Sequence, residues 1–110
     1  MKALLLWDDR LEKRILTEAL QMHGLTVNAH TDLTQAFEQW DTQPAEIVIC
    51  ALRLDDPTQA VHLIRRFSVA PLLMLLNPVG EDLHFELLNI GADMVMERPF
   101  STRLFLGYVK

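Results

Sequence analysis

The sequence predicts a doubly wound α/β domain built on a five-stranded parallel sheet. Short apolar runs alternate with amphipathic segments five times along the chain, in the order strand then helix. The apolar runs are continuous, which indicates strands buried on both faces, as in a parallel sheet covered by helices. Short connections and right-handed crossovers then give a doubly wound sheet. The length of 110 residues suits one domain spanning residues 1–110.

The strands are expected where the apolar runs occur. Residues 3–7, 47–51 and 72–76 are the strongest runs, and residues 25–29 and 94–96 are weaker. The run at 25–29, LTVNA, is the most polar, which predicts a strand at the edge of the sheet.

The helices are expected between these runs, where apolar residues recur at helical spacing. Gly24 and Gly91 are predicted to end the first and fourth helices, and Ser101 to cap the fifth. The residues expected to face inward are Leu11, Ile15, Ala19 and Met22 with Leu16 and Leu20 beside them, then Leu33, Ala36, Phe37 and Trp40, then Val61, Ile64 and Phe67, then Leu83, Leu87 and Ile90, and finally Leu104 and Tyr108.

The composition excludes several classes of protein. Ten Lys and Arg against fifteen Asp and Glu give a net charge of −5, which disfavours direct contact with nucleic acid or an anionic membrane. No apolar run approaches the ~18 residues that a membrane-spanning helix needs. The single cysteine excludes an internal disulfide and fits a reducing, cytoplasmic compartment. The histidines show no zinc-ligand spacing, and no glycine-rich phosphate loop is present.

Functional groups are expected at the carboxyl ends of the strands, where doubly wound domains place their sites. Asp8 and Asp9 follow the first strand. Two adjacent carboxylates repel each other and need a cation or hydrogen-bond donors, and Mg²⁺ accepts such ligands. The alternative is a pair of solvated acids at the start of a helix, where negative charge is favoured.

Arg98-Pro99-Phe100 follows the fifth strand and is the second candidate. Its basic group is expected to reach the acids of the first strand, and its proline can follow a cis bond. The alternative is an ordinary turn with a surface arginine.

Four segments together resemble the receiver domain of two-component response regulators: LLLWDD, EIVICALRL, PLLMLL and GADMVMERPF. Their order and spacing match over all 110 residues, with 42 positions from Asp9 to residue 51 and 22 from residue 76 to Arg98. The resemblance implies the flavodoxin-like, CheY-like (βα)5 fold with strand order 2-1-3-4-5.

The resemblance also implies a phosphorylation site that this chain has partly lost. In the family, an aspartate after the third strand accepts a phosphoryl group from a histidine kinase and holds Mg²⁺ with the acid pair. A Thr or Ser and a Lys contact the phosphoryl group, and an aromatic residue on the fifth strand acts as the conformational switch. The corresponding residues here are Asp8, Asp9, Ala51, Leu76, Arg98 and, for the aromatic, Val95.

These replacements predict a degenerate site. Ala51 offers no nucleophilic oxygen, and Leu76 cannot donate a hydrogen bond. The planar fork of Arg98 suits a carboxylate, so we expect it to pair with Asp8 or Asp9 and to replace the cation. Mg²⁺ binding at Asp8 and Asp9 is then weak or absent, no other cofactor is expected, and the chain is not expected to be an enzyme.

Asp55 and Asp56 offer a second possible phosphoryl acceptor after the third strand. The favoured interpretation is that they precede or cap the helix that starts near Pro57.

The leading hypothesis is therefore a pseudo-receiver domain that works without phosphorylation and regulates an attached effector beyond residue 110. By family habit, that effector binds DNA in transcription regulation. The alternatives are a phosphoryl-accepting receiver that uses Asp55 or Asp56 with Mg²⁺, and a small-ligand sensor beside Ala51 and Leu76.

The expected partners are a second copy of the chain and possible signalling proteins such as a histidine kinase. The family's dimer surface runs over the fourth helix, fifth strand and fifth helix. The segment 81–90 has no Lys or Arg, which argues against inter-subunit salt bridges and favours an apolar contact. The residues expected at this surface are Leu83, Leu87, Asp93, Val95, Glu97, Arg103 and Phe105.

Overall fold

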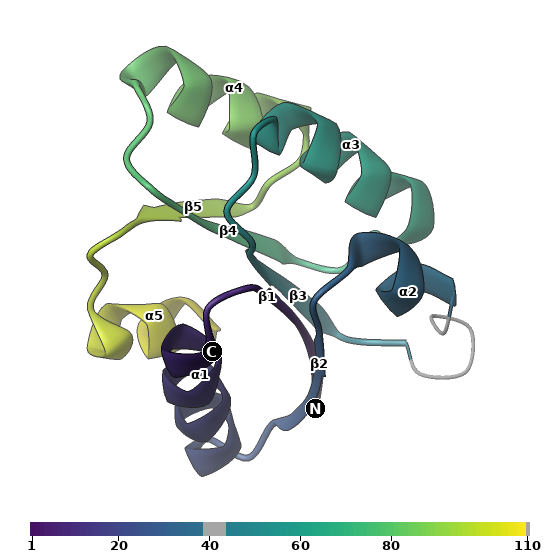
Figure 1. Ribbon diagram of the computed structural model, residues 1–110, viewed down its shortest axis with the longest axis vertical. Helices are drawn as coiled ribbons and strands as arrows, with labels where there is room; N and C mark the ends of the chain where they lie inside the picture. The colour runs from purple at the N-terminus through teal and green to yellow at the C-terminus, as the bar shows by residue number, and fades with distance from the viewer. Residues whose placement is uncertain (39–43, 110) are drawn as a thin grey trace.

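The five strands form one parallel sheet in the order β2-β1-β3-β4-β5, as predicted (Figure 1). The computed structural model describes residues 1–38 and 44–109. The strands are β1 (Lys2–Trp7), β2 (Thr26–His30), β3 (Ile47–Ala51), β4 (Leu72–Leu76) and β5 (Met94–Glu97). The helices are α1 (Arg10–Met22), α2 (Leu33–Glu38), α3 (Pro57–Phe67), α4 (Glu81–Ile90) and α5 (Thr102–Val109).

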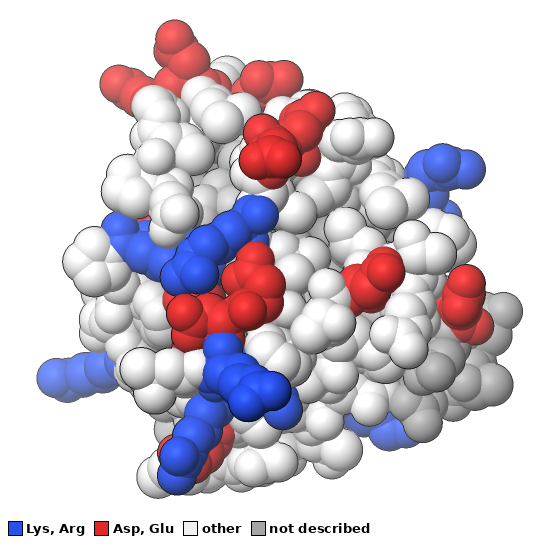
Figure 2. All heavy atoms as spheres, viewed as in Figure 1, with Lys and Arg blue, Asp and Glu red and all other residues white. Residues whose placement is uncertain are grey.

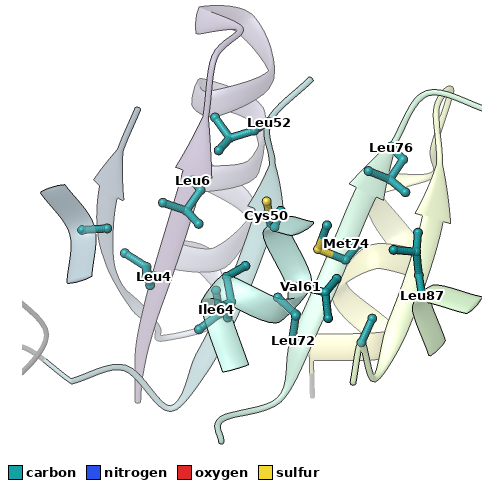
Figure 3. Packing of buried hydrophobic residues seen from close by; sticks show 14 of the residues in the cluster. Leu4, Leu6, Cys50, Leu52, Val61, Ile64, Leu72, Met74, Leu76 and Leu87 are labelled. Carbon is teal, nitrogen blue, oxygen red and sulfur yellow. The ribbon is translucent and has the colours of Figure 1, made fainter. Parts of the chain in front are cut away.

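Two hydrophobic cores explain why the strand sequences are continuously apolar. Alternate residues of each central strand point to opposite faces of the sheet. Leu4 and Leu6 of β1 join the core under α2, α3 and α4, while Leu5 joins the core under α1 and α5. Figure 3 shows the first core, in which Leu87 of α4 packs among the strand residues. The polar strand β2 lies at an edge of the sheet, as expected.

The helix boundaries follow the predicted capping residues. The side chain of Ser101 accepts a hydrogen bond from the Leu104 amide at 3.3 Å, at the start of α5. Gly91 follows α4 with φ of 133°, a left-handed conformation that favours glycine. Gly24 lies just past α1 with φ of 85°.

The prediction for the inward face of α1 was too broad. Leu16, Ala19 and Leu20 are buried, whereas Leu11 and Met22 are 67% and 84% exposed. All three buried residues belong to the predicted set, but only the stripe through Leu16 and Leu20 packs on the sheet, where α1 contacts β1 and β2.

The inward face of α5 is also different. Phe105 and Val109 are buried, and Leu104 and Tyr108 are 58% and 48% exposed. Both pairs have the same four-residue spacing, so periodicity could not choose between them. Phe105 faces the core, where its ring meets Phe100 edge to face at 6.2 Å.

The other helices match the prediction more closely. Ala36, Phe37, Val61 and Ile64 are buried. Phe67 is half exposed, but its ring stacks on Phe37 at 4.9 Å. Trp40 lies outside the described residues.

None of the described helices is both long and apolar enough to cross a bilayer.

Candidate functional site at the carboxyl ends of the strands

The acid pair lies at the end of β1, and its carboxylates are engaged by backbone amides. Asp9 caps α1: its Oδ1 accepts a hydrogen bond from the Glu12 amide at 2.9 Å. Asp8 Oδ2 accepts one from the Arg53 amide at 2.6 Å. The hydrogen bond from the Glu12 amide, with a smaller contribution from the Arg53 guanidinium, lowers the pKa of Asp9 below its ordinary value. Asp9 therefore stays ionised as a helix cap.

Arg53 brings a first guanidinium to the acid pair. It follows β3 by two residues, and its Nη2 lies 3.4 Å from Asp9 Oδ2. Both side chains are partly exposed, so this contact is weak by itself. Arg53 was not among the predicted site residues. Its only sequence signal is its position two residues after Ala51, at the end of a central strand.

Arg98 brings a second guanidinium, but its partner is not the predicted one. Nε and Nη2 donate to the two carboxylate oxygens of Glu12, each at 2.7 Å. Nη2 also donates to the carbonyl oxygen of Ala51 at 2.7 Å. The predicted pairing with Asp8 or Asp9 is therefore wrong, because the guanidinium binds the carboxylate of Glu12 in the first turn of α1. That carboxylate is available because the backbone amide of Glu12, and not its side chain, binds the cap residue Asp9.

The Arg98–Glu12 pair is largely buried, with 11% and 12% of the two side chains exposed. The hydrogen bonds to Glu12 raise the pKa of Arg98, and the charges of Glu12, Asp8 and Asp9 add to the effect. Nη1 of Arg98 is buried without a hydrogen-bond partner among the described residues. The Arg98–Pro99 peptide bond is cis, as the motif predicted.

Ala51 and Leu76 contribute to the site through their backbones. The side chain of Ala51 is fully buried, and its carbonyl is the acceptor for Arg98. Leu76 points into the core that Figure 3 shows, while its carbonyl accepts the Arg98 amide at 2.7 Å. A hollow of about 320 Å³ lies against Leu76, between the loops that follow β3 and β4, but Ala51 does not line it.

Cys50 is fully buried next to this site, and burial raises the pKa of its thiol to about 11. A thiol with so high a pKa is not reactive at neutral pH.

The residues at this edge do not fit a magnesium site. Within residues 1–38 and 44–109, no three His, Cys, Asp or Glu side chains lie close enough together to hold a metal ion. The oxygens of Asp8 and Asp9 already accept hydrogen bonds from Arg53 and Glu12, and two guanidinium groups supply the local positive charge. A divalent cation would meet like charge instead of a third carboxylate.

Asp56 acts as the predicted helix cap. Its Oδ1 accepts a hydrogen bond from the Gln59 amide at 3.2 Å, and Pro57 occupies the first turn of α3. Asp55 is exposed in the same loop. This arrangement confirms the capping interpretation for Asp56.

Glu97 was predicted at the dimer surface, and it is partly buried with its carboxylate bound to a neighbouring loop. Oε2 accepts a hydrogen bond from the Val79 amide at 2.7 Å, which ties β5 to the loop between β4 and α4. Glu97 and Arg98 are adjacent, so the end of β5 contacts that loop on one side and α1 on the other.

The predicted dimer surface is wrong for two residues. Leu87 and Phe105 are fully buried, because each is the core-facing residue of its helix. Leu83 and Val95 are partly buried against the first core, and Asp93 accepts hydrogen bonds from the Leu72 amide and Arg65. Arg103 is exposed, as a surface role requires. The exposed apolar residues of α4 and α5 are Phe85, Leu88, Leu104 and Tyr108.

No family model matches the chain. Solved structures do match it over nearly its whole length. A two-component response regulator from Clostridium difficile has a TM-score of 0.89 and 17% identity, covering 100% of this chain and 93% of that one. The chain has the receiver-domain fold.

Two further structures share this fold. A response regulator from Thermotoga maritima has a TM-score of 0.84 and 20% identity, with 98% of this chain and 92% of that chain covered. HP1043, described as an orphan response regulator of Helicobacter pylori, has a TM-score of 0.83 and 14% identity, with 99% and 92% covered.

Proposed function

We propose that this receiver-fold domain is a signalling module that works without aspartyl phosphorylation. One observation carries the proposal. Residue 51 is alanine, and the Arg98–Glu12 pair packs against its carbonyl. No oxygen nucleophile is available at the end of β3, so no acyl phosphate can form there.

The electrostatics of the pocket support the same proposal. The guanidinium groups of Arg53 and Arg98, which are part of the chain, offset two of the three negative charges of Asp8, Asp9 and Glu12. These fixed charges take the place of an exchangeable divalent cation. The site is thus largely neutralised by the chain's own side chains, and we expect the domain to gain little from Mg²⁺.

Hydrogen bonds at the end of β5 support a single conformation. Glu97 holds the loop between β4 and α4, and Arg98 holds α1 and β3. A switch requires a ligand that binds two states with different free energies. With no covalent phosphoryl group to supply that difference, the domain is expected to act through protein contacts.

The proposed output is contact with another protein or with an effector domain attached to this one. Phe85, Leu88, Leu104 and Tyr108 offer exposed apolar area on α4 and α5 for such contact. A structural neighbour, HP1043, is described as an orphan response regulator. A regulator of transcription is the form of output that we propose.

Treatment with phosphodonors tests the proposal. The chain is incubated with acetyl phosphate and Mg²⁺, and separately with beryllofluoride and Mg²⁺, and is followed by intact mass and by NMR amide shifts. We expect no mass gain and no saturable shift near Asp8, Asp9 and Arg53.

The result that overturns the proposal is a mass gain of one phosphoryl group. The Asp55→Asn/Asp56→Asn variant then locates it. If this variant no longer gains the phosphoryl mass, the alternative function is established, namely a receiver that uses Asp55 or Asp56 as its acceptor. These two residues are the ones to replace because both lie in the loop after β3.

A further inference from the structure

Two surfaces of opposite charge lie on opposite sides of the molecule. α1 and α5 cover one face of the sheet, and α4 lies over the other (Figure 1). Figure 2 shows acidic side chains at the top, over α4, and basic side chains at the lower left, over α1. Neither surface includes the Arg98–Glu12 pair or the acid pair of the candidate site.

The basic surface surrounds a hollow at the first half of α1. The hollow has a volume of about 720 Å³, and it is lined by Trp7, Arg10, Leu11, Lys13, Arg14, Thr17 and Glu18. Leu11 is 67% exposed, and Lys13 Nζ lies 5.0 Å from the centre of the Trp7 ring. Three of the ten basic residues of an acidic chain therefore gather around an aromatic and an aliphatic side chain. Arg14 contacts Glu18 at 3.3 Å, an exposed pair that is easily exchanged.

The acidic surface is the outer side of α4. Glu81, Asp82 and Glu86 are exposed, and the helix has no Lys or Arg. Phe85 is 65% exposed, one turn after Glu81 and Asp82 on the same side of the helix. An aromatic side chain surrounded by carboxylates is the chemical complement of the hollow on α1.

We propose that these two surfaces bind each other between copies of the chain, with α4 of one copy docked on α1 of the next. Phe85 fills the hollow beside Trp7 and Leu11, and the α4 carboxylates face Arg10 and Arg14. A symmetric contact through α4 would instead bring six carboxylates together with no basic residue on either helix. This inference extends the proposed function to a specific partner, and it does not depend on the pocket being inert.

The contact has a consequence for the size of the assembly. A head-to-tail contact leaves one free surface at each end, so association does not stop at two copies unless a ring closes. A symmetric contact stops at a dimer. The mass of the associated species therefore distinguishes the two arrangements.

The test begins with the unmodified chain in analytical ultracentrifugation, from roughly 10 μM to roughly 1 mM, the range for weak interfaces. We expect the average mass to rise above the 12.6 kDa of one copy, to exceed two copies at the highest concentration, and to fall as salt is raised. A chain that stays at one copy throughout contradicts the proposal, and so does a mass that levels at two copies.

Charge reversal gives a sharper second test. The Arg10→Glu/Arg14→Glu variant and the Asp82→Lys/Glu86→Lys variant should each remain single copies, while an equal mixture of the two should associate again. Phe85→Ala should weaken association of the otherwise unmodified chain at least tenfold. The controls are Arg66→Glu and Asp55→Lys, exposed single charge reversals of the same sign away from both surfaces. Association that survives the α1 reversal, or a mixture that fails to associate, overturns the proposal.

Discussion

Two partly buried arginines hold this domain together, one at each end of the sheet, and they do so in different ways. Arg65, in the last turn of α3, donates twice to the carbonyl of Gly91, at 2.9 and 2.7 Å. It also donates to the carbonyls of Ser68 and Ala70 and to the carboxylate of Asp93. Each of its three nitrogens therefore has an acceptor, and four of its five hydrogen bonds go to the backbone.

Arg98 is bonded less completely. Nε and Nη2 bind Glu12 and the Ala51 carbonyl, but Nη1 has no partner among the described residues although it is buried. The comparison shows that Arg65 has a structural role, because backbone carbonyls of the segments that follow α3 and α4 accept its hydrogen bonds. Arg98 lies near the charges of Glu12, Asp8 and Asp9, and there charge compensation matters more than complete hydrogen bonding.

The largest predicted effect is at Arg65. Arg65→Met removes five hydrogen bonds and leaves the carbonyls of Ser68, Ala70 and Gly91 without their donor. We expect the free energy of unfolding to fall by about 3 kcal/mol, measured by urea denaturation. The control is Arg66→Met, an exposed neighbour on the same helix that should change the stability by less than about 0.5 kcal/mol. Equal losses in the two variants would refute the role of Arg65.

The second prediction concerns the Arg98–Glu12 pair. Glu12→Gln leaves the Arg98 charge in place without its carboxylate, and we expect a loss of about 2 kcal/mol in unfolding free energy. Glu12→Leu combined with Arg98→Met should recover most of that loss, because a buried ion pair often contributes no more than an apolar pair of similar volume. Glu18→Gln, in the exposed pair with Arg14, is the matched control and should have little effect. If the double variant is less stable than Glu12→Gln, the ion pair stabilises the fold through its hydrogen bonds, as Arg65 does, and the prediction is wrong.

The third prediction concerns the loop between β4 and α4. Glu97→Gln weakens the hydrogen bond to the Val79 amide, and we expect a loss of about 1 kcal/mol. Hydrogen exchange at residues 77–80 should become faster, while exchange in β1 and β3 stays the same. Glu86→Gln, an exposed acid on the outer side of α4, serves as the control. Unchanged exchange at residues 77–80 would mean that Glu97 does not hold this loop.

The sequence predicted the sheet better than the helix faces, and the reason is physical. The central strands are apolar at every position because both faces are covered, so their assignment did not depend on orientation. In α5, Leu104 with Tyr108 and Phe105 with Val109 repeat with the same spacing, and only the shape of the core selects the second pair.

The candidate site was predicted in part. Asp8, Asp9 and Arg98 do lie at one edge of the sheet, and the carbonyl of Ala51 lies beside them, whereas the loss of a phosphoryl acceptor at position 51 stays a prediction. The partner of Arg98 was not predictable from the motif, because Glu12 lies within a helix and its reach depends on where α1 docks. Arg53 was not predicted, because its contact with the acid pair depends on the path of the loop after β3.

The smallest predicted effect is the pH dependence that Asp9 contributes. Its pKa in the folded chain lies below its ordinary value of 3.8, so the unfolded chain binds the proton more tightly. The stabilising contribution is therefore complete above the unfolded value and is lost as the pH falls through the folded one. Denaturation of the unmodified chain and of Asp9→Asn from neutral pH to about pH 3 should show a smaller fall for the variant. Identical pH profiles would contradict the role of Asp9 as a charged cap.

A Mg²⁺ titration tests most directly the claim that built-in guanidinium groups have replaced the cation at this edge. The amide signals of Asp8, Asp9 and Arg53 are followed by NMR as Mg²⁺ is raised through the millimolar range, with K⁺ at matched ionic strength as the control. We predict small, non-saturating shifts that are the same for both ions. Saturable, Mg²⁺-specific shifts at these three residues would contradict the account.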